Sequence, residues 1–558
     1  MDKITAVKQS NKGYKRLAIF LSSLLLLITL WAFSPSGGGR LFEISKNLEI
    51  YNTLFKELNT YYVDEIDPGK LMRTGVDAML GTLDPYTNYI SESQIERYRY
   101  MTEGRYNGIG AVIHKIDNQF TIVEPHEGSP AFEAGLRAGD ILLSVDGQSL
   151  EGRDIEELGT FLRGAPNTKM TLSLKRPGQK DLVTAEVTRN EIEIPNVPYH
   201  GMVDPAVGYI NLTTFTPDAS KNIANALREL KRDNPGMQGI IIDLRENGGG
   251  LLREAVNISN IFIPKDEEVV VTKGKVKDWD QSFKTTNNPM DEQIPLVVLI
   301  NKRSASASEI VSGVIQDLDR GILVGQRSYG KGLVQNTKEI GYNAKVKLTT
   351  AKYYIPSGRC IQSVSYKDGE PVDIADDMRT PFKTRNGRKV LDGGGVTPDV
   401  ALEEIKLPPF AQYLRDEFYI FRYVTDWSLK NKTIDSPEVF KFNQYDDFVK
   451  FILDKKPNFV SESEKALETL KAALETDQYS KLTDADVKAL EKKIKKNLQT
   501  ELEKNRAAII TEIERDIITR NYHQKGKIVY TLEHDTEVLE AVNVIKDKDR
   551  YAKILKPK

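Results

Sequence analysis

The sequence has a single cysteine, few histidines and no excess of charge of either sign. Cys360 is the only cysteine among 558 residues, which excludes an intrachain disulfide and any metal site built on paired cysteines. Lysine plus arginine number 78 against 80 aspartate plus glutamate, spread along the chain, so nucleic acid is not expected as a partner. None of the five histidines lies within residues 201–522, so a serine nucleophile there would need another base.

An uncharged and largely apolar run occupies residues 17–33, directly after a basic N-terminal stretch. Its length is at the short end for a membrane span, and the alternative is a secretory signal peptide. The residues around Ala32 resemble a cleavage site, but Pro35 should hinder cleavage. We therefore expect residues 1–39 to form a cytoplasmic basic segment, an uncleaved transmembrane anchor and a linker, with the remaining chain exported.

Residues 40–103 are expected to be helical. Apolar residues recur at intervals of three and four over residues 41–62, which predicts a long amphipathic helix. Asp67 and Pro68 are suited to the cap and first position of a second helix that runs to about Leu80. The apolar stripe of the first helix leaves two partners open, the body of the protein or another chain in a homo-oligomer.

Short strands and glycine-rich turns follow over residues 104–193. The loop Gly108-Ile109-Gly110-Ala111 and the segment 128–147 resemble a PDZ domain of the bacterial protease-linked kind. The resemblance implies that this loop presents backbone N–H groups to a peptide's terminal carboxylate, while the peptide adds as a strand along residues 109–113 with its last side chain on Ile109 and Ile113. The alternative is a glycine-rich hairpin without a ligand.

Residues 194–407 alternate between buried strands and amphipathic helices, which predicts an α/β fold with parallel sheet layers. Strands are expected at residues 207–212, 239–244, 296–300, 321–324 and 344–355, and helices at 217–231, at 251–261 and after Ser308. Three glycines, residues 248–250, separate the second strand from its helix. They indicate either a tight turn or a backbone whose N–H groups face a ligand.

A serine-rich turn joins the strand at 296–300 to the next helix. Unpaired N–H groups at such a junction suit acyl transfer, but Ser306 and Glu309 also match a capping box, so a purely structural role remains an alternative. Lys331 follows between two glycines. The segment 325–331 imitates a phosphate-binding loop, yet Gly332 replaces the required Ser or Thr and the next residues favour a strand.

Residues 408–558 are rich in Lys, Glu, Ala and Leu. We expect charged helices at 461–479 and 483–522, the second capped at Thr483, then one strand at 529–532 and a short helix. No catalytic constellation is evident there. A solvated partner-binding face is the expected role of this mostly helical extension.

Taken together, the motifs of residues 41–400 resemble those of the carboxy-terminal processing, or tail-specific, proteases. They are the PDZ segment, Asp-Leu-Arg-x-Asn-Gly-Gly-Gly, Ser-Ala-Ser-Ala-Ser-Glu, Gly-Lys-Gly-x-x-Gln, Ala-Lys-Tyr-Tyr and Gly-Val-Thr-Pro-Asp, in that order. The resemblance implies a crotonase-like α/β protease core at 194–407 with the PDZ domain inserted. It assigns the nucleophile to Ser306, the base to Lys331, the orienting amide to Gln335 and the oxyanion donors to the backbone of Gly250 and Ala307.

The resemblance further implies a serine endopeptidase that cleaves exported proteins near their C-termini, anchored in the membrane with its body in the bacterial periplasm or cell envelope. Free apolar tails captured by the PDZ domain would be its substrates, and neither metal nor cofactor is expected. Lys331 must be neutral to act as a base, which requires a pKa about three units below that of free lysine. The alternatives are an inactive exported PDZ scaffold that binds C-termini and an acyl-transfer enzyme acting on acyl-CoA.

Overall fold

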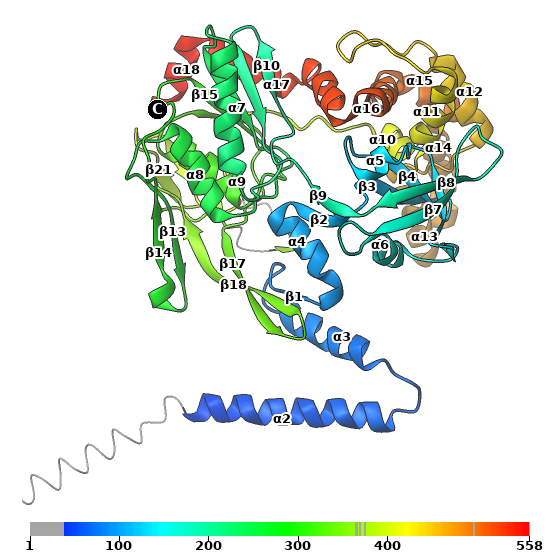
Figure 1. Cartoon of the computed structure of the whole chain (residues 1–558), viewed down its shortest axis with the longest axis horizontal. Helices are drawn as coiled ribbons and strands as arrows, with labels where there is room; N and C mark the ends of the chain where they lie inside the picture. Colours follow the sequence, from blue (N-terminus) through cyan, green and yellow to red (C-terminus); the bar gives the residue numbers. More distant parts are fainter. Residues whose placement is uncertain (1–37, 363–365, 368–369, 373–374, 495–496, 557–558) are drawn as a thin grey trace, which may run out of the picture. The chain divides into compact units, whose positions relative to one another are not determined.

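The computed structural model describes residues 38–362, 366–367, 370–372, 375–494 and 497–556 (Figure 1). The chain divides into two compact units, Met1–Leu83 and Asp84–Lys558, and each is described by itself. The anchor expected at residues 17–33 lies outside the described residues. Within the described ranges, every helix is too short or too polar to cross a bilayer.

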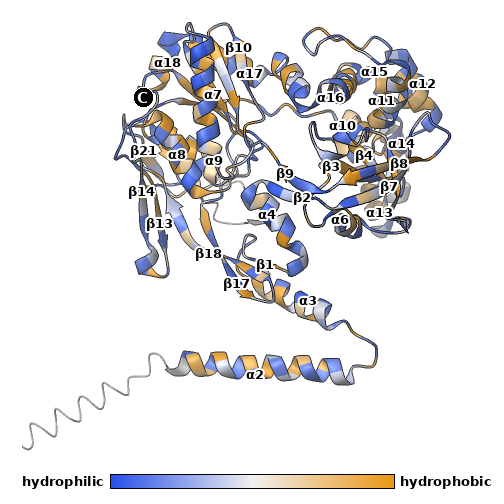
Figure 2. Ribbon diagram, viewed as in Figure 1, coloured by the Kyte–Doolittle hydropathy of each residue, from blue (hydrophilic) through white to orange (hydrophobic). Residues whose placement is uncertain are grey.

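The first unit contains the two helices that the sequence predicts. Helix α2 (Gly38–Tyr61) carries apolar and charged residues interspersed along its length (Figure 2), and most of its apolar side chains are exposed. Helix α3 (Pro68–Gly81) starts at Pro68, and the Asp67 carboxylate accepts hydrogen bonds from the N–H groups of Gly69 (2.8 Å) and Lys70 (3.1 Å). This is the expected N-terminal cap.

A six-stranded sheet forms the centre of the second unit, in the order β10-β11-β12-β15-β16-β23. Strands β10 and β11 are antiparallel, and all other neighbours are parallel. The strands are β10 (Tyr199–Asp204), β11 (Val207–Asn211), β12 (Gly239–Asp243), β15 (Leu296–Ile300), β16 (Ile322–Gly325) and β23 (Val400–Ala401). The parallel layers predicted for this region are thus confirmed.

Both faces of this sheet are buried, which explains the unbroken apolar run of β15. Alternate residues of that strand enter two separate apolar cores. One core contains helices α7 (Ala219–Asp233), α8 (Leu252–Phe262) and α9 (Ala307–Asp317). The other is closed by α17 (Thr536–Lys546), which comes from the C-terminal region of the chain.

A second sheet lies beside the core and carries the segment after Lys331. Its central path is β1-β18-β13-β14, and β17 pairs with β18 in a long hairpin. The strands are β1 (Asn88–Ile90), β13 (Glu268–Gly274), β14 (Gln281–Lys284), β17 (Leu333–Gly341) and β18 (Ala344–Tyr354). Strand β17 excludes a phosphate-binding loop at 325–332, because such a loop leads into a helix.

Smaller elements are α4 (Ile95–Glu103), η1 (Glu92–Gln94), η2 (Lys277–Trp279), η3 (Asp376–Met378), β19 (Tyr366–Lys367), β20 (Glu370–Pro371), β21 (Pro381–Lys383) and β22 (Lys389–Leu391).

The β-rich domain between α4 and β10 has a sheet of order β3-β4-β5-β7-β8, with β6 beside β5. Its elements are β2 (Arg105–Gly108), β3 (Ala111–Ile116), β4 (Gln119–Pro125), α5 (Pro130–Glu133), β5 (Ile141–Val145), β6 (Gln148–Ser149), α6 (Ile155–Leu162), β7 (Lys169–Lys175), β8 (Val183–Thr188) and β9 (Asn190–Glu193). The sheet closes on α6 around a core of its own. Strand β3 ends the sheet, so it is the edge at which a peptide could add.

The C-terminal region forms a helical domain with a core rich in aromatic residues. Its helices are α10 (Pro409–Asp416), α11 (Tyr419–Lys430), α12 (Tyr445–Lys455), α13 (Glu462–Thr476), α14 (Ser480–Ile494), α15 (Leu498–Lys504), α16 (Arg506–Glu533), α17 and α18 (Lys548–Ile554). Three local predictions were wrong. The single helix expected at 483–522 is divided among α14, α15 and α16, with Asn497 and Asn505 outside the helices. The strand expected at 529–532 is part of α16, and Thr483 lies inside α14 rather than at a cap.

Candidate functional site

Ser306 directly precedes helix α9, at the end of the turn that follows β15, and its backbone conformation is strained. Its φ and ψ are 57° and −112°, a region that costs a residue with a side chain about 1–3 kcal/mol. The neighbouring serines are fully buried and already have partners: Ser304 Oγ donates to the Leu244 carbonyl and Ser308 Oγ to the Asn247 carbonyl, each at 2.8 Å. Ser306 is partly exposed. The structure therefore separates Ser306 from its two neighbours, a distinction that the residues alone did not provide.

A buried carboxylate, Glu309, organises the surroundings of Ser306. Its Oε2 atom accepts hydrogen bonds from the backbone N–H groups of Ser306 (2.8 Å) and Lys331 (2.9 Å). Its Oε1 atom accepts hydrogen bonds from Ser328 Oγ (2.5 Å) and the Gly330 N–H (2.7 Å). Burial raises the pKa of Glu309, and these four hydrogen bonds oppose that shift. Sequence reasoning treated Glu309 only as a capping residue. The Ser306-x-x-Glu309 spacing was its one signal.

Lys331 lies in an environment that favours the neutral amine. Burial, followed by the neighbouring Lys347 ammonium, lowers the pKa of Lys331 to about 8, against the opposing effect of Glu309 and Asp84. The Lys331 Nζ atom sits 4.5 Å from the centre of the Tyr86 ring. Among the described residues, no hydrogen bond joins this amine to the Ser306 hydroxyl. The two residues are instead linked through their backbones.

Two further contacts fix the Lys331 backbone. The Tyr353 hydroxyl is 2.6 Å from the Lys331 carbonyl oxygen and 3.1 Å from that of Ser306. A Cβ on Gly332 would lie 2.7 Å from the backbone nitrogen of Gln362, so only glycine fits at that position. The close packing expected around Lys331 is present on this side.

Gln335 lies on β17, with its side chain directed to the hairpin partner. Its Nε2 atom donates to Thr349 Oγ1 (3.2 Å), and that hydroxyl donates to Asp84 Oδ1 (3.1 Å). No contact between the Gln335 amide and the Lys331 amine is formed within the described chain. The orienting role assigned to Gln335 stays a prediction.

The glycine loop after β12 lies directly against the start of α9. A Cβ on Gly249 would fall 2.9 Å from both the Ser306 Cβ and the Ala307 nitrogen, and φ of Gly249 is 97°. Gly250 forms a parallel bridge to Phe215, whose carbonyl accepts the Leu251 N–H (2.8 Å). The structure thus brings the Gly250 segment and Ala307 to the same place as Ser306. The role of the Gly250 and Ala307 N–H groups as oxyanion donors stays a prediction.

The loop Gly108-Ile109-Gly110-Ala111 is held by α5 and the turn before it. The Ile109 carbonyl accepts the Ala131 N–H, and the Gly110 carbonyl accepts the His126 N–H and Ser129 Oγ. In a trans peptide the N–H points away from the carbonyl, so the N–H groups of Gly110 and Ala111 are directed away from α5. Ile109 and Ile113 belong to the domain core or pack against it.

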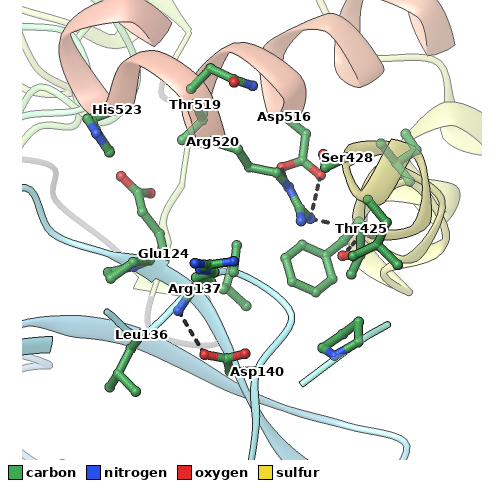
Figure 3. A pocket seen from close by; sticks show the side chains of 18 of the residues that line it. Glu124, Leu136, Arg137, Asp140, Thr425, Ser428, Asp516, Thr519, Arg520 and His523 are labelled. Carbon is green, nitrogen blue, oxygen red and sulfur yellow. Dashed lines mark hydrogen bonds and ion pairs between the residues drawn. The ribbon is translucent and has the colours of Figure 1, made fainter. Parts of the chain in front are cut away.

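A separate cavity of about 710 Å3 lies between the β-rich domain and helices α11 and α16 (Figure 3). Charged side chains in its lining pair with one another, as in Arg176 with Asp140 (2.7 Å) and Arg520 with Asp516 (3.1 Å). The Phe132 and His523 rings meet beside it at 5.3 Å. None of the predicted site residues is among those described as lining this cavity, so we place the candidate active site at Ser306.

Comparisons with known proteins match three parts of the chain to family models. Residues 206–372 match peptidase family S41, residues 121–176 match a PDZ domain, and residues 410–545 match the C-terminal helical domain of a probable PDZ-protease. The third match covers the region for which the sequence resemblance gave no assignment.

Two curated proteins are similar over more than half of the chain. A carboxy-terminal-processing protease of Bartonella bacilliformis is 33% identical over 340 residues, which span 61% of this chain and 77% of that one. A probable CtpA-like serine protease of Staphylococcus aureus (strain COL) is 34% identical over 330 residues, which span 59% of this chain and 65% of that one. Among solved structures, a photosystem II D1 C-terminal processing protease is 26% identical, with a TM-score of 0.35, over 63% of this chain and 92% of that one.

Proposed function

We propose that this chain, which belongs to peptidase family S41 and to its serine-type carboxy-terminal processing proteases, uses Ser306 as its nucleophile and Lys331 as its general base. The observation that carries this assignment is the shared acceptor Glu309 Oε2, which ties the backbones of both residues together. The lowered pKa of Lys331, about 8, supports it, because a base must be neutral when it acts.

In the proposed reaction, the Lys331 amine takes the proton of the Ser306 hydroxyl as Oγ attacks the substrate carbonyl carbon. In the structure this amine lies 4.5 Å from the centre of the Tyr86 ring, and in the proposed reaction it turns towards the Ser306 hydroxyl. The backbone N–H groups of Gly250 and Ala307 stabilise the oxyanion of the tetrahedral intermediate. The Lys331 ammonium then gives its proton to the leaving amine of the substrate. The neutral Lys331 amine next takes a proton from a water molecule, which hydrolyses the acyl-enzyme ester. Gln335 holds the Lys331 amine in place once the amine has turned.

The PDZ domain supports the further proposal that substrates are chosen by their free C-terminal tails. The N–H groups of Gly110 and Ala111 face away from α5 and suit a terminal carboxylate, and edge strand β3 can accept the tail as an added strand. Capture of the tail raises the local concentration of nearby peptide bonds at Ser306. Such substrates would be unstructured near their ends and apolar at the last residue.

We also propose that the enzyme is anchored by residues 17–33 and acts outside the cytoplasm, in the periplasm or cell envelope. The basic N-terminal flank, the apolar run and Pro35 support this. Membrane fractionation of the full-length chain tests it, since a soluble product beginning near residue 35 would instead establish a cleaved signal peptide.

The central test is cleavage of an unstructured peptide with an apolar free C-terminus, followed by mass spectrometry. Wild type should release fragments from that end, while Ser306→Ala and Lys331→Ala should each be inactive with unchanged circular dichroism. Because members of one catalytic unit are non-additive, the double variant should be no worse than either single one. Cleavage by Ser306→Ala at the wild-type rate would show that the nucleophile lies elsewhere.

A further inference from the structure

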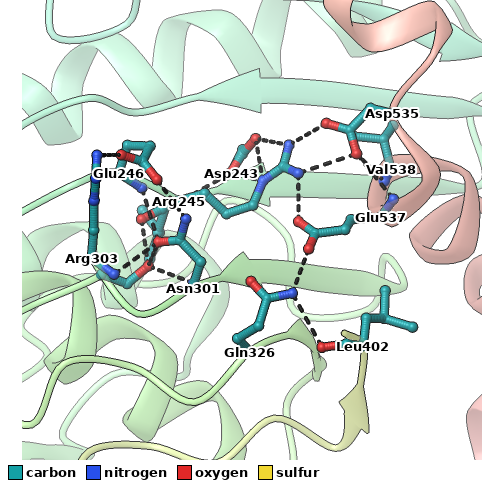
Figure 4. A network of polar contacts seen from close by, with 12 residues as sticks. Asp243, Arg245, Glu246, Asn301, Arg303, Gln326, Leu402, Asp535, Glu537 and Val538 are labelled. Atoms are coloured by element: carbon teal, nitrogen blue, oxygen red, sulfur yellow. Dashed lines mark hydrogen bonds and ion pairs between the residues drawn. The ribbon is translucent and has the colours of Figure 1, made fainter. Parts of the chain in front are cut away.

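One carboxylate of the C-terminal helix α17 contacts both loops that carry proposed catalytic groups (Figure 4). Glu537 Oε2 accepts a hydrogen bond from Arg245 Nη1 at 2.6 Å, and Glu537 Oε1 accepts one from Gln326 Nε2 at 2.5 Å. The Glu537 side chain thus joins two segments that are far apart in the chain.

The first segment is the loop after β12. Arg245 lies between Asp243, the last residue of that strand, and the glycines that approach Ser306. Its guanidinium group also binds Asp243 (2.6 Å) and Asp535 (2.8 Å), so it is surrounded by three carboxylates. Because the Arg245 side chain is largely buried, its position is fixed by these partners rather than by solvent.

The second segment is the loop after β16. Gln326 directly follows this strand and precedes Ser328, Gly330 and Lys331 on the same loop. Gln326 is buried, and Nε2 has a second acceptor in the Leu402 carbonyl (3.3 Å). Glu309 therefore holds the far end of this loop from inside the core, while Glu537 holds its near end from the C-terminal domain.

Glu537 is itself held at the start of its helix. Asp535 caps α17 by accepting the N–H groups of Glu537 (3.0 Å) and Val538 (3.1 Å). The helix is anchored by its apolar face, since Val538 and Ala541 are buried against the central sheet. A buried carboxylate on a fixed helix end transmits the position of that helix to whatever it binds.

We propose that Glu537 is a positioning residue for peptide-bond cleavage, which keeps the Gly250 segment and the Lys331 loop aligned on Ser306. The C-terminal helical domain is on this view an integral part of the active site, rather than only a surface for partners. The inference rests on the proposed function, because it concerns the alignment of the same nucleophile, base and oxyanion donors.

The test compares Glu537→Gln with Glu540→Gln in the full-length enzyme. Glu540 lies on the same helix and pairs with Arg550 at 2.6 Å, and within the described part of the chain no hydrogen bond or ion pair joins it to either loop, which makes it a matched control. Glu537→Gln should lower kcat about tenfold or more and leave KM for a tail peptide nearly unchanged, since small misplacements of reacting groups are costly. Glu540→Gln should behave as wild type.

A second readout distinguishes positioning from simple structural support. If the Lys331 loop loosens in Glu537→Gln, water reaches the amine and the midpoint of the pH–rate profile moves upward from about 8. The burst of p-nitrophenol from p-nitrophenyl acetate gives the fraction of molecules with a reactive Ser306, so each rate is expressed per active site. Partial unfolding would lower the burst without moving the midpoint, and that result would overturn the inference.

Gln326→Met provides an independent variant that leaves α17 untouched. It removes the amide that donates a hydrogen bond to Glu537. Like Glu537→Gln, it should lower kcat and raise the midpoint of the pH–rate profile. Wild-type rate and midpoint in both Glu537→Gln and Gln326→Met, with Ser306→Ala inactive, would overturn the positioning role while leaving the peptidase assignment intact. Activity in Ser306→Ala would instead overturn the assignment itself.

Discussion

Ser306 and Lys331 donate their backbone N–H groups to the same oxygen atom, Oε2 of Glu309, at 2.8 and 2.9 Å. The two residues come from different strand ends, so this oxygen fixes the distance between their backbones. Their side chains remain separate in the structure, with the Lys331 amine over the Tyr86 ring. Glu309 therefore positions the two backbones, and the approach of the Lys331 amine to the Ser306 hydroxyl belongs to the proposed reaction.

Cleavage should increase with pH through the pKa of Lys331. The protonated amine cannot accept a proton, so activity is lost as pH falls below about 8 and reaches a plateau above it. Initial rates measured between pH 6 and 10 on one tail peptide check this. A flat profile across that range would contradict the role of Lys331 as base.

Lys331→Met should be inactive and also more stable than wild type at neutral pH. In the folded state the Lys331 pKa is lowered, so below about 8 the chain must hold a proton that burial disfavours. The variant should gain about 1–3 kcal/mol at pH 7, an advantage that shrinks as pH rises towards the pKa of free lysine. Urea unfolding at pH 7 and pH 10 measures the difference, and an equal gain at both values would argue against this cause.

Glu309→Gln should lower both stability and activity. An amide offers one acceptor oxygen where the carboxylate accepts four hydrogen bonds, so buried donors on the Ser306 and Lys331 backbones would lose partners. We expect a loss of about 2–4 kcal/mol in the free energy of unfolding. Glu229→Gln is the control, because that carboxylate is exposed and its ion pair is with His200 on the surface. A variant with wild-type stability would show that the four contacts are dispensable.

Ser306→Gly and Ser308→Ala should have opposite effects. Glycine removes the strain at φ 57°, so Ser306→Gly should be more stable by about 1–2 kcal/mol but inactive. Ser308→Ala removes a buried hydroxyl that donates to Asn247, so it should lose about 1 kcal/mol of stability and keep most of its activity. Thermal unfolding and peptide cleavage, measured together, check the pair. Retained cleavage in Ser306→Gly would refute the choice of nucleophile.

Gly110→Ala should impair recognition of tails rather than chemistry. A Cβ there would lie 2.3 Å from the Ser129 Cβ, and φ is 75°, so the loop must move. KM for a free-tailed peptide should rise about tenfold, while the reaction with p-nitrophenyl acetate stays normal. Gly147→Ala controls for backbone strain, because Gly147 has a similar positive φ of 79° and open space where the new methyl group would lie. Equal KM values in the two variants would count against tail capture by this loop.

The alternating α/β pattern was predictable because the buried strands β12 and β15 are apolar on both faces, and their helices carry clear amphipathic spacing. The strand expected at 529–532 was wrong for a local reason. Val529, Tyr530 and Leu532 favour strands by propensity, but burial of Tyr530 in the core of the helical domain holds them in α16. Tertiary packing outweighed a short-range preference there.

The candidate site could be predicted only as a list of residues. Ser306 and Lys331 were found through a resemblance. The capping spacing signals only the bond between Glu309 and the Ser306 N–H, whereas the bonds of Glu309 to the Lys331 loop and of Glu537 to Arg245 depend on segments brought together by the fold. No spacing rule connects Glu537 with Arg245. The prediction of a solvated partner-binding face for the C-terminal region did not include the packing of α17. The apolar stripe of α17 does not by itself reveal that this helix covers the central sheet.

The two faces of the central sheet are covered at very different stages of synthesis. Helices α7, α8 and α9 are interleaved with the strands, but α17 emerges only after the helical domain has been made. Until then the nascent protease exposes an apolar sheet face and lacks the carboxylate that binds Arg245. A chain that has not yet been made as far as α17 therefore leaves Val297 and Leu299 without the helix that covers them, so folding of this sheet is completed only near the end of synthesis.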